Sequence, residues 1–313
     1  MRVVRYYPPG GPEKLEVQDE PMPAEVKENE VLIKVHAVGL IWTEITWPIY
    51  QNAEGEYISH IPGHDFSGVV VEMGPETRNS GLKPGSEVYA FTSRRNHEGA
   101  MAEYAKADID QVLPKPKNLS FVEAATVPLS ALTAWQALFE HGKLQKGQRL
   151  LVTGAAGGTG VFAVQFALHI GAYVIGTGSS TRSREILEKL GVNKFVDYKT
   201  QNLKTEVGEV DLVLECVGGK SLENALSVVK KDGLLISINE FNCEKIAEQK
   251  GVRGKFFIVS MNAEELTAIT ELIESGKVVP FVDRTFGLES VQQAFKEASL
   301  GHVHGKSIIT VVE

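Results

Sequence analysis

The segment Leu150-Leu-Val-Thr-Gly-Ala-Ala-Gly-Gly-Thr-Gly160 decides the fold of this chain. The apolar run 150–153 is typical of a short buried strand, and the glycines that follow indicate a tight turn. The apolar segment Val161–Ile170 then predicts a helix, and Tyr173–Thr177 predicts a second strand. In this order of elements, backbone N–H groups and the helix dipole favour a phosphate group at the start of the helix.

The residues of the turn suit a bound pyrophosphate. Gly157 lets the backbone approach the phosphates, Gly158 keeps the turn unhindered, and Gly160 permits close packing of strand and helix. Ala155 takes the first glycine position of the common G-x-G-x-x-G pattern, which an alanine tolerates if its φ is negative. The alternative is a glycine turn in an α/β protein that binds no nucleotide. The cofactor-binding residues predicted in this turn are Ala156, Gly157, Gly158, Thr159 and Gly160.

Composition narrows the classes of protein that fit. A chain of 313 residues with 43% hydrophobic and 23% charged residues is typical of a soluble globular protein with two domains. The net charge of −8 argues against nucleic acid as a partner. No apolar run reaches the roughly 18 residues of a membrane span, and the N-terminus lacks a signal-peptide core. Cys216 and Cys243 cannot build a disulfide framework, so we expect half-buried or buried thiols and a cytoplasmic location.

The hydrophobic pattern changes near residue 122. Before it, β-branched runs such as Val31–Val38 and Phe66–Met73 predict strands. After it, short apolar strands alternate with helical segments such as Ser183–Gly191 and Ala263–Glu274, which indicates a parallel sheet covered on both faces. The strands predicted for this sheet are 150–153, 173–177, 195–197, 211–216, 234–238 and 256–259. A final strand–helix–strand segment begins near Phe281, and we expect it to dock back on the first domain.

The end of the second strand of the sheet indicates which dinucleotide binds. An NAD-binding chain usually carries an acidic residue about 20 residues after the glycine turn, where it holds the ribose 2′-hydroxyl. This chain reads Gly176-Thr-Gly-Ser-Ser-Thr-Arg-Ser-Arg184 there, with hydroxyl groups and two guanidinium groups but no carboxylate. Such a set suits a 2′-phosphate, so we predict NADPH as the cofactor. The alternative is a solvated helix start with incidental arginines.

Several further motifs, in the same order and spacing, resemble the zinc-free quinone oxidoreductases of the medium-chain dehydrogenase/reductase superfamily. The resemblance extends over nearly the whole chain. Beside the glycine turn, the motifs that carry it are Gly10-Gly-Pro-Glu-Lys-Leu-Glu16, Ile61-Pro-Gly-His-Asp-Phe-Ser-Gly68, Leu82-Lys-Pro-Gly-Ser-Glu-Val-Tyr89, Ala131-Leu-Thr-Ala-Trp-Gln-Ala-Leu138 and Gly301-His-Val-His-Gly-Lys306.

The resemblance implies an α/β protein that joins a GroES-like β-barrel catalytic domain to a Rossmann domain with a doubly wound parallel sheet. We assign residues 1–122 and 279–313 to the first domain and 123–278 to the NADPH-binding domain. The active site is then expected in the cleft between them, and a homodimer is expected to form through the edge strand 256–259.

The resemblance also assigns roles to single residues. It places Thr133 near the nicotinamide and Lys306 near the cofactor. It places Tyr198 near the 2′-phosphate together with the residues of the serine- and arginine-rich loop, namely Ser179, Ser180, Arg182 and Arg184.

Metal binding is not expected. Zinc-dependent relatives use a Cys, a His and a second Cys, and this chain retains only His64. Ile41 takes the first Cys position, and Ser130 lies near the second. Two distant cysteines also exclude a four-cysteine structural zinc site. We therefore predict structural hydrogen bonds for His64.

Without a metal, the simplest hydride acceptor is a conjugated carbonyl compound or a quinone. Ile41, Trp42 and Trp47 are candidates for shaping the substrate cleft, and Tyr50 and Tyr57 are candidates for donating a hydrogen bond to the substrate oxygen. These aromatic residues equally suit an ordinary core or a loop packed on the barrel.

Three functions remain open at this point. The preferred one is an NADPH-dependent oxidoreductase that transfers hydride to quinones or α,β-unsaturated carbonyls. The second is an enoyl-thioester reductase of the same fold, for which Arg94-Arg95 is the only conspicuous basic pair in the first domain. The third is an NADPH-binding structural or regulatory protein with little turnover.

Overall fold

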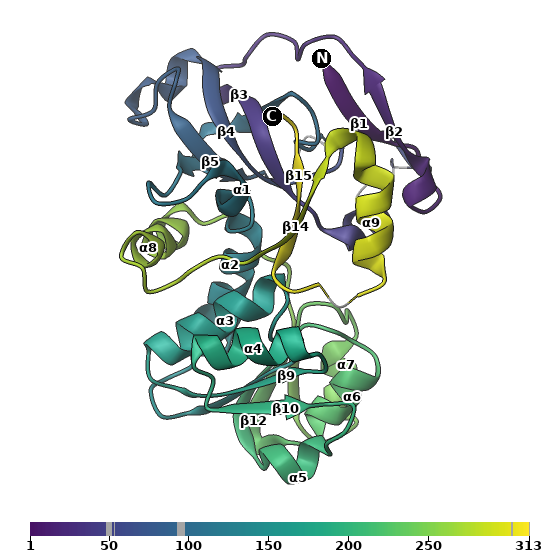
Figure 1. The fold of residues 1–313 in the computed structure, drawn as a ribbon, viewed down its shortest axis with the longest axis vertical. Coiled ribbons are helices and arrows are strands. Elements are labelled where there is room, and N and C mark those ends of the chain that lie inside the picture. Colours follow the sequence, from purple (N-terminus) through teal and green to yellow (C-terminus); the bar gives the residue numbers. More distant parts are fainter. Residues whose placement is uncertain (48–51, 53, 93–97, 302, 313) are drawn as a thin grey trace. The chain divides into compact units, whose positions relative to one another are not determined.

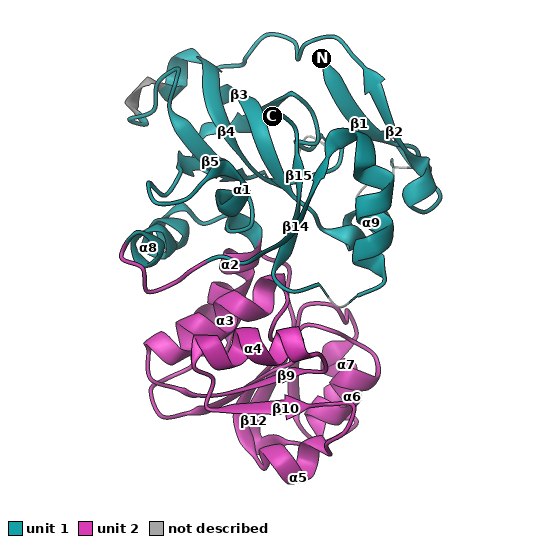
Figure 2. Ribbon diagram, viewed as in Figure 1, with its two compact units in different colours: residues 1–129, 261–274, 280–313 teal, residues 130–260, 275–279 magenta. Residues whose placement is uncertain are grey.

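The computed structural model describes residues 1–47, 52, 54–92, 98–301 and 303–312. These residues form two units (Figure 2). Unit 1 contains residues 1–129, 261–274 and 280–313, and unit 2 contains residues 130–260 and 275–279. The helix α2 (Pro128–Trp135) begins in unit 1 and continues into unit 2.

Unit 2 holds the predicted parallel sheet. Its strand order is β10-β9-β8-β11-β12-β13. The chain forms the central strand β8 first, then adds β9 and β10 on one side and β11, β12 and β13 on the other. Leu150, Leu151 and Val152 of β8 are all fully buried, although successive side chains point to opposite faces, so both faces of the sheet are covered here. The strands are β8 (Arg149–Val152), β9 (Tyr173–Gly178), β10 (Lys194–Asp197), β11 (Val210–Glu215), β12 (Val229–Ser237) and β13 (Arg253–Phe256).

Helices connect these strands. Two of them, α3 and α4, pack on β8, β9 and β10, whereas α6 and α7 pack on β11, β12 and β13 (Figure 1). The helices are α3 (Gly158–His169), α4 (Thr181–Leu190), α5 (Leu203–Val207), α6 (Lys220–Leu226) and α7 (Cys243–Glu248).

Unit 1 is built on a mainly antiparallel sheet and a short hairpin. Its described sheet has the order β14-β15-β3-β4-β5-β7, and β6 also pairs with β3. The sheet strands are β3 (Glu30–Gly39), β4 (Asp65–Met73), β5 (Glu87–Phe91), β6 (Tyr104–Asp108), β7 (Val112–Pro114), β14 (Val282–Gly287) and β15 (Lys306–Thr310). The hairpin strands are β1 (Arg2–Tyr6) and β2 (Leu15–Asp19), and the helices are α1 (Phe121–Ala124), α8 (Ala263–Glu274) and α9 (Val291–Ser299).

The C-terminal segment returns to the N-terminal sheet, as predicted. β15 pairs antiparallel with β3, with Ile309 opposite Val38, and β14 pairs parallel with β15. The buried Phe295 of α9 packs into the same core as Ile33 and Phe66 of the sheet. This segment therefore belongs to the hydrophobic core of unit 1 although it follows the nucleotide-binding pattern in sequence.

Some predicted boundaries are wrong. The strand predicted at 256–259 is β13, which ends at Phe256, because its register with β12 pairs Arg253–Phe256 with Leu234–Ser237. The helix predicted at Ser183–Gly191 is α4, which begins at Thr181, because Ser180 is its N-cap and accepts the Ser183 N–H.

Unit 1 contains a helix that follows the parallel sheet in sequence. The unit continues past residue 122 to Leu129 and includes α8. Hydrogen bonds explain the place of α8: the buried Tyr89 hydroxyl lies 2.7 Å from Thr270 Oγ1, and Asn118 donates to the Ile273 carbonyl.

The contact between Tyr89 and α8 yields a stability prediction. Replacing Tyr89 with Phe removes the buried hydroxyl that contacts Thr270 Oγ1 and the Leu266 carbonyl, so the free energy of unfolding in urea should fall by about 1 kcal/mol. The control Tyr104→Phe, at a half-buried position of β6, should change it by less than about 0.5 kcal/mol. Equal losses in the two variants would contradict this role for the Tyr89 hydroxyl.

Candidate functional site

The glycine turn between β8 and α3 has the geometry of a phosphate-binding turn. Gly154 takes the left-handed conformation (φ 59°), and Ala155 lies outside that region, which meets the condition under which an alanine is tolerated. A Cβ atom on Gly160 would lie 2.4 Å from the Gly154 carbonyl oxygen and 2.7 Å from Ala155 Cα. Only glycine therefore fits at position 160, because α3 starts directly against the turn.

The start of α3 fits a pyrophosphate. Gly157 is the N-cap, so no side chain at this position can accept a hydrogen bond from the first N–H groups of the helix. Residues 157–159 are partly exposed, whereas Ala156 and Gly160 are buried. α3 is twelve residues long, and its start is partly exposed. The N–H groups of its first turn are thus available to an anion.

The end of β9 has no room for an acidic side chain. A Cβ atom on Gly178 would lie 2.6 Å from Ser183 Oγ and 3.0 Å from Phe195 Cε2. Position 178 is where an acid that holds the ribose 2′-hydroxyl would stand. A side chain at position 178 would therefore crowd Ser183 and Phe195.

The residues predicted for a 2′-phosphate lie around this strand end in unit 2. Ser179 Oγ donates to the Tyr198 hydroxyl at 2.9 Å, although 19 positions separate them in the sequence. The Arg184 guanidinium stacks on the Phe195 ring at 4.3 Å and lies 3.4 Å from Glu188 Oε1. Arg182 is exposed on the first turn of α4. The fold thus brings Ser179 and Tyr198 together and holds Arg184 against a ring.

Lys306 is buried in unit 1 rather than exposed on a surface. Its Nζ donates to the fully buried Asp65, which also accepts the Leu129 N–H at 3.2 Å. Burial raises the pKa of the Asp65 carboxyl, and the Lys306 ammonium opposes that rise. A Cβ atom on Gly39 would lie 2.8 Å from Lys306 Cε, so the pair needs a glycine beside it.

The candidates for the substrate cleft that the structure describes differ in their burial and in their contacts. Trp47 stacks on the His64 ring with a centroid distance of 6.0 Å, whereas the side chains of Trp42 and Tyr57 are 45% and 50% exposed. Ile41 is half-buried directly before Trp42. Tyr50 lies outside the described residues, as do Arg94 and Arg95. Thr133 belongs to α2 in unit 2, where it is buried.

His64 is held by polar side chains. Its Nε2 lies 3.3 Å from Glu44 Oε1, and its Nδ1 lies 3.4 Å from Thr92 Oγ1. Glu44 Oε1 also accepts the Gly63 N–H at 2.6 Å. Within the described part of the chain, no group of three or more His, Cys, Asp or Glu side chains could hold a metal ion.

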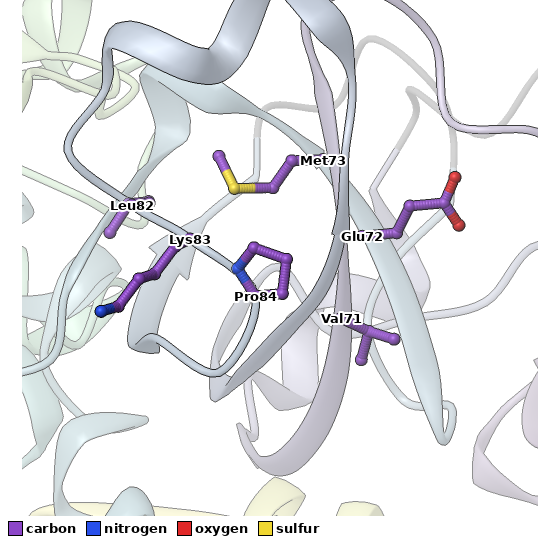
Figure 3. Close-up of a pocket in the computed structure, with 6 residues that line it drawn as sticks. All are labelled: Val71, Glu72, Met73, Leu82, Lys83 and Pro84. Atoms are coloured by element: carbon purple, nitrogen blue, oxygen red, sulfur yellow. The ribbon is translucent and has the colours of Figure 1, made fainter.

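Two further features of the surface and sequence bear on the site. A surface hollow of about 410 Å³ in unit 1 is lined by Val71, Glu72, Met73, Leu82, Lys83 and Pro84, none of which is a predicted site residue (Figure 3). No helix among the described residues is long and apolar enough to cross a membrane.

Sequence reasoning missed Glu215, a fully buried carboxylate that ends the apolar strand β11. The signal for it was an acidic residue directly after Leu212-Val213-Leu214.

Comparison with known proteins identifies the family. The model of the alcohol dehydrogenase GroES-like domain matches residues 27–117, and the model of the zinc-binding dehydrogenase family matches residues 190–309. A probable zinc-binding oxidoreductase, mitochondrial, from Arthroderma benhamiae is 38% identical over 95% of this chain and 93% of that protein. The chain belongs to the quinone oxidoreductase-like family of the medium-chain dehydrogenase/reductase superfamily.

Two more relatives support this membership. The 2-methylene-furan-3-one reductase of Solanum lycopersicum is 33% identical over 99% of this chain and 79% of that protein. The solved structure of the quinone oxidoreductase from Coxiella burnetii superposes with a TM-score of 0.92 at 29% identity, covering 100% of this chain and 99% of that one. The predicted fold class, a GroES-like domain with a Rossmann-type domain, is confirmed, and the family is one of oxidoreductases.

The close packing at Gly160 yields a prediction. A Gly160→Ala variant must shift α3 away from the turn, so it should lose about 1–3 kcal/mol of stability and bind dinucleotide more weakly. The control Gly287→Ala places its Cβ in open space at a negative φ, and it should behave like the wild type. Thermal unfolding and titration with NADPH test both variants, and unchanged binding by Gly160→Ala would argue against this role of the turn.

Proposed function

We propose that this protein is an NADPH-dependent reductase of α,β-unsaturated carbonyl compounds or quinones that works without zinc. The observation that carries the cofactor choice is the end of β9, where Gly178 leaves no space for an acid and hydroxyl and guanidinium groups surround the loop. An anion is favoured at such a site, whereas a neutral ribose hydroxyl would lack its usual carboxylate acceptor.

The residues of unit 2 divide the binding of NADPH between them. The N–H groups at the start of α3 would hold the pyrophosphate, and Ser179, Ser180, Arg182 and Tyr198 would hold the 2′-phosphate. Arg184 would contribute from its stacked position on Phe195. Thr133 and Lys306 are proposed to lie near the cofactor, as the family resemblance implies. Bound NADPH would supply a hydride, and the protein would position the cofactor through these polar groups.

The proposal of zinc-free chemistry rests on the ligand set. Ile41 replaces a thiolate ligand with an apolar side chain, and His64 is already engaged by Glu44 and Thr92. These residues do not fit a catalytic zinc ion, which needs three protein ligands with an open position. Without such a Lewis acid, the carbonyl oxygen receives only hydrogen bonds, so an acceptor whose negative charge is delocalised is reduced most readily.

The protein's part in the reaction is to orient the acceptor and exclude water from it. Ile41, Trp42 and Trp47 are proposed to supply the apolar surface for a conjugated acceptor, and Tyr57 to donate a hydrogen bond to its oxygen; Tyr50 stays a second proposed donor. The name of the tomato relative supports this substrate class, because a 2-methylene-furan-3-one carries a methylene group conjugated to a ketone.

The oligomeric state and the cellular location are part of the proposal. β13 ends the described sheet of unit 2, and Phe241 and Ile258 near it are 63% and 54% exposed, which suits a homodimer formed through this edge. We propose a cytoplasmic enzyme without nucleic-acid or membrane partners. The proposed functional domains are residues 1–122 with 279–313, and residues 123–278.

A screen of NADPH oxidation tests the reaction. Enals, enones and quinones should be reduced, and enoyl-thioesters and simple ketones should react much more slowly. Preincubation with a chelator, followed by metal analysis, should leave both activity and metal content unchanged. Preferential turnover of enoyl-thioesters, loss of activity with the metal, or binding of NADPH without any turnover would each contradict the proposal.

Replacing Arg182 with Ala tests the 2′-phosphate site. Loss of one charge-assisted hydrogen bond should weaken NADPH binding about tenfold while NADH binding stays the same. The control Lys189→Ala removes an exposed charge from the last turn of the same helix and should change neither. An unchanged preference for NADPH in Arg182→Ala would remove this residue from the site.

A further inference from the structure

Glu215 lies at the position of the sheet where doubly wound folds bind their ligands. It is the last residue of β11, and β11 pairs in parallel with β8. The chain leaves β8 toward β9 on one side and leaves β11 toward β12 on the other. The carboxyl ends of β8 and β11 therefore flank the point at which the strand order reverses, and ligands bind in the crevice outside that point.

The Glu215 carboxylate gathers donors from three loops at these strand ends. From the end of β8, Thr153 Oγ1 donates to Oε1 at 3.0 Å. From the turn after β11, the Val217 N–H donates to Oε1 at 3.0 Å, and the Gly218 N–H lies 3.0 Å from Oε1 and 2.9 Å from Oε2. From the end of β12, Ser237 Oγ donates to Oε2 at 3.3 Å. The side chain is fully buried.

These hydrogen bonds hold the turn after β11 against the glycine turn. Thr153 Oγ1 also accepts the Cys216 N–H at 3.1 Å, so the same hydroxyl joins both segments. A Cβ atom on Gly154 would lie 3.1 Å from Val217 Cγ2, which shows how closely the two turns approach. Val217 nevertheless stays 56% exposed. An apolar side chain is thus presented to solvent beside the proposed phosphate-binding turn.

We propose that Glu215 is a positioning residue for the cofactor: it holds the 216–218 turn, with the exposed Val217, at the edge of the dinucleotide site. The inference rests on the proposed function, because it assumes that NADPH binds at the glycine turn. Glu215 acts through the backbone that it orders.

The chemistry of the side chain supports this role over simple core packing. An ionised carboxylate can only accept hydrogen bonds. In all five hydrogen bonds of the Glu215 side chain, a hydroxyl or a backbone N–H group is the donor and a carboxylate oxygen is the acceptor. A glutamine of the same shape replaces one oxygen with an NH₂ group, which can only donate and would face another donor. Glu215→Gln therefore releases part of the network without changing the size of the side chain.

The chain offers a matched control at the opposite end of the same strand. Asp211 near the start of β11 accepts the Arg149 N–H at 2.7 Å and pairs with Lys230 at 2.6 Å, so it also ties β11 to β8 and β12. It lies at the amino ends of the strands, away from the turns. Asp211→Asn, like Glu215→Gln, changes a carboxylate to an amide and weakens contacts of β11 with β8 and β12. The two variants differ in position, because Asp211 lies at the amino end of the strands and Glu215 at the carboxyl end.

Titration of each full-length variant with NADPH, followed by the fluorescence of the bound cofactor, tests the proposal. At a temperature well below all melting temperatures, Glu215→Gln should raise the dissociation constant for NADPH about tenfold, and Asp211→Asn should leave it within about twofold of the wild type. Thr153→Val keeps the side-chain shape but removes the hydrogen bond to Glu215 and the acceptor of the Cys216 N–H, so it should also weaken NADPH binding. This second variant keeps the test available if Glu215→Gln does not fold.

The outcomes separate the two proposals. If the wild type binds NADPH and both Glu215→Gln and Thr153→Val bind it equally well, Glu215 has only a structural role and the inference is overturned. Equal weakening by Asp211→Asn also overturns it, because loss of stability would then explain the effect. If the wild type binds no NADPH, the proposed function itself fails, and the inference fails with it.

Discussion

The close approach of α3 to the turn that follows β8 is the constraint on which the nucleotide-binding half depends. An added Cβ on Gly160 would come within 2.4 Å of the Gly154 carbonyl oxygen, so the helix can start there only if residue 160 lacks a side chain. That start leaves backbone N–H groups at the carboxyl end of a buried parallel sheet, and the α3 dipole adds to their attraction for an anion. Ser179, Ser180 and Tyr198 directly follow the carboxyl ends of β9 and β10, and Arg182 and Arg184 lie at the start of α4.

Different interactions stabilise the buried carboxylates of the two units. In unit 1, Asp65 is neutralised by Lys306, and Gly39 makes room for the pair. In unit 2, Glu215 is satisfied by hydroxyl and backbone N–H donors from three loops. Burying a charge is costly unless it is paired or hydrogen-bonded, so each arrangement specifies a particular geometry of the segments around it. Both carboxylates thereby link segments that the sequence separates.

Local patterns predicted most of the parallel sheet. The predicted strands fell within one residue of β8, β9, β10 and β11. Burial on both faces makes a central strand such as β8 rich in apolar residues, and this composition is visible in the sequence. The strand predicted at 256–259 was misplaced because the apolar run there continues past the last residue that pairs with β12. The helix predicted from Ser183 begins two residues earlier, at Thr181, because Ser180 and Ser183 form a reciprocal capping pair.

The sequence by itself determined the order of strand, glycine turn and helix, the absence of a carboxylate from residues 176–184, and an isoleucine at position 41, where the family resemblance implies the first zinc-ligand cysteine of zinc-dependent relatives. These features depend on residue type and short spacing, which can be recognised along the chain. Only the tertiary structure decided that Ser179 meets Tyr198, that Lys306 pairs with Asp65 across 241 positions, and that Glu215 joins three loops. The physical reason is that a side-chain hydrogen bond requires two groups within about 3 Å, and for distant residues only the register of the strands sets that distance.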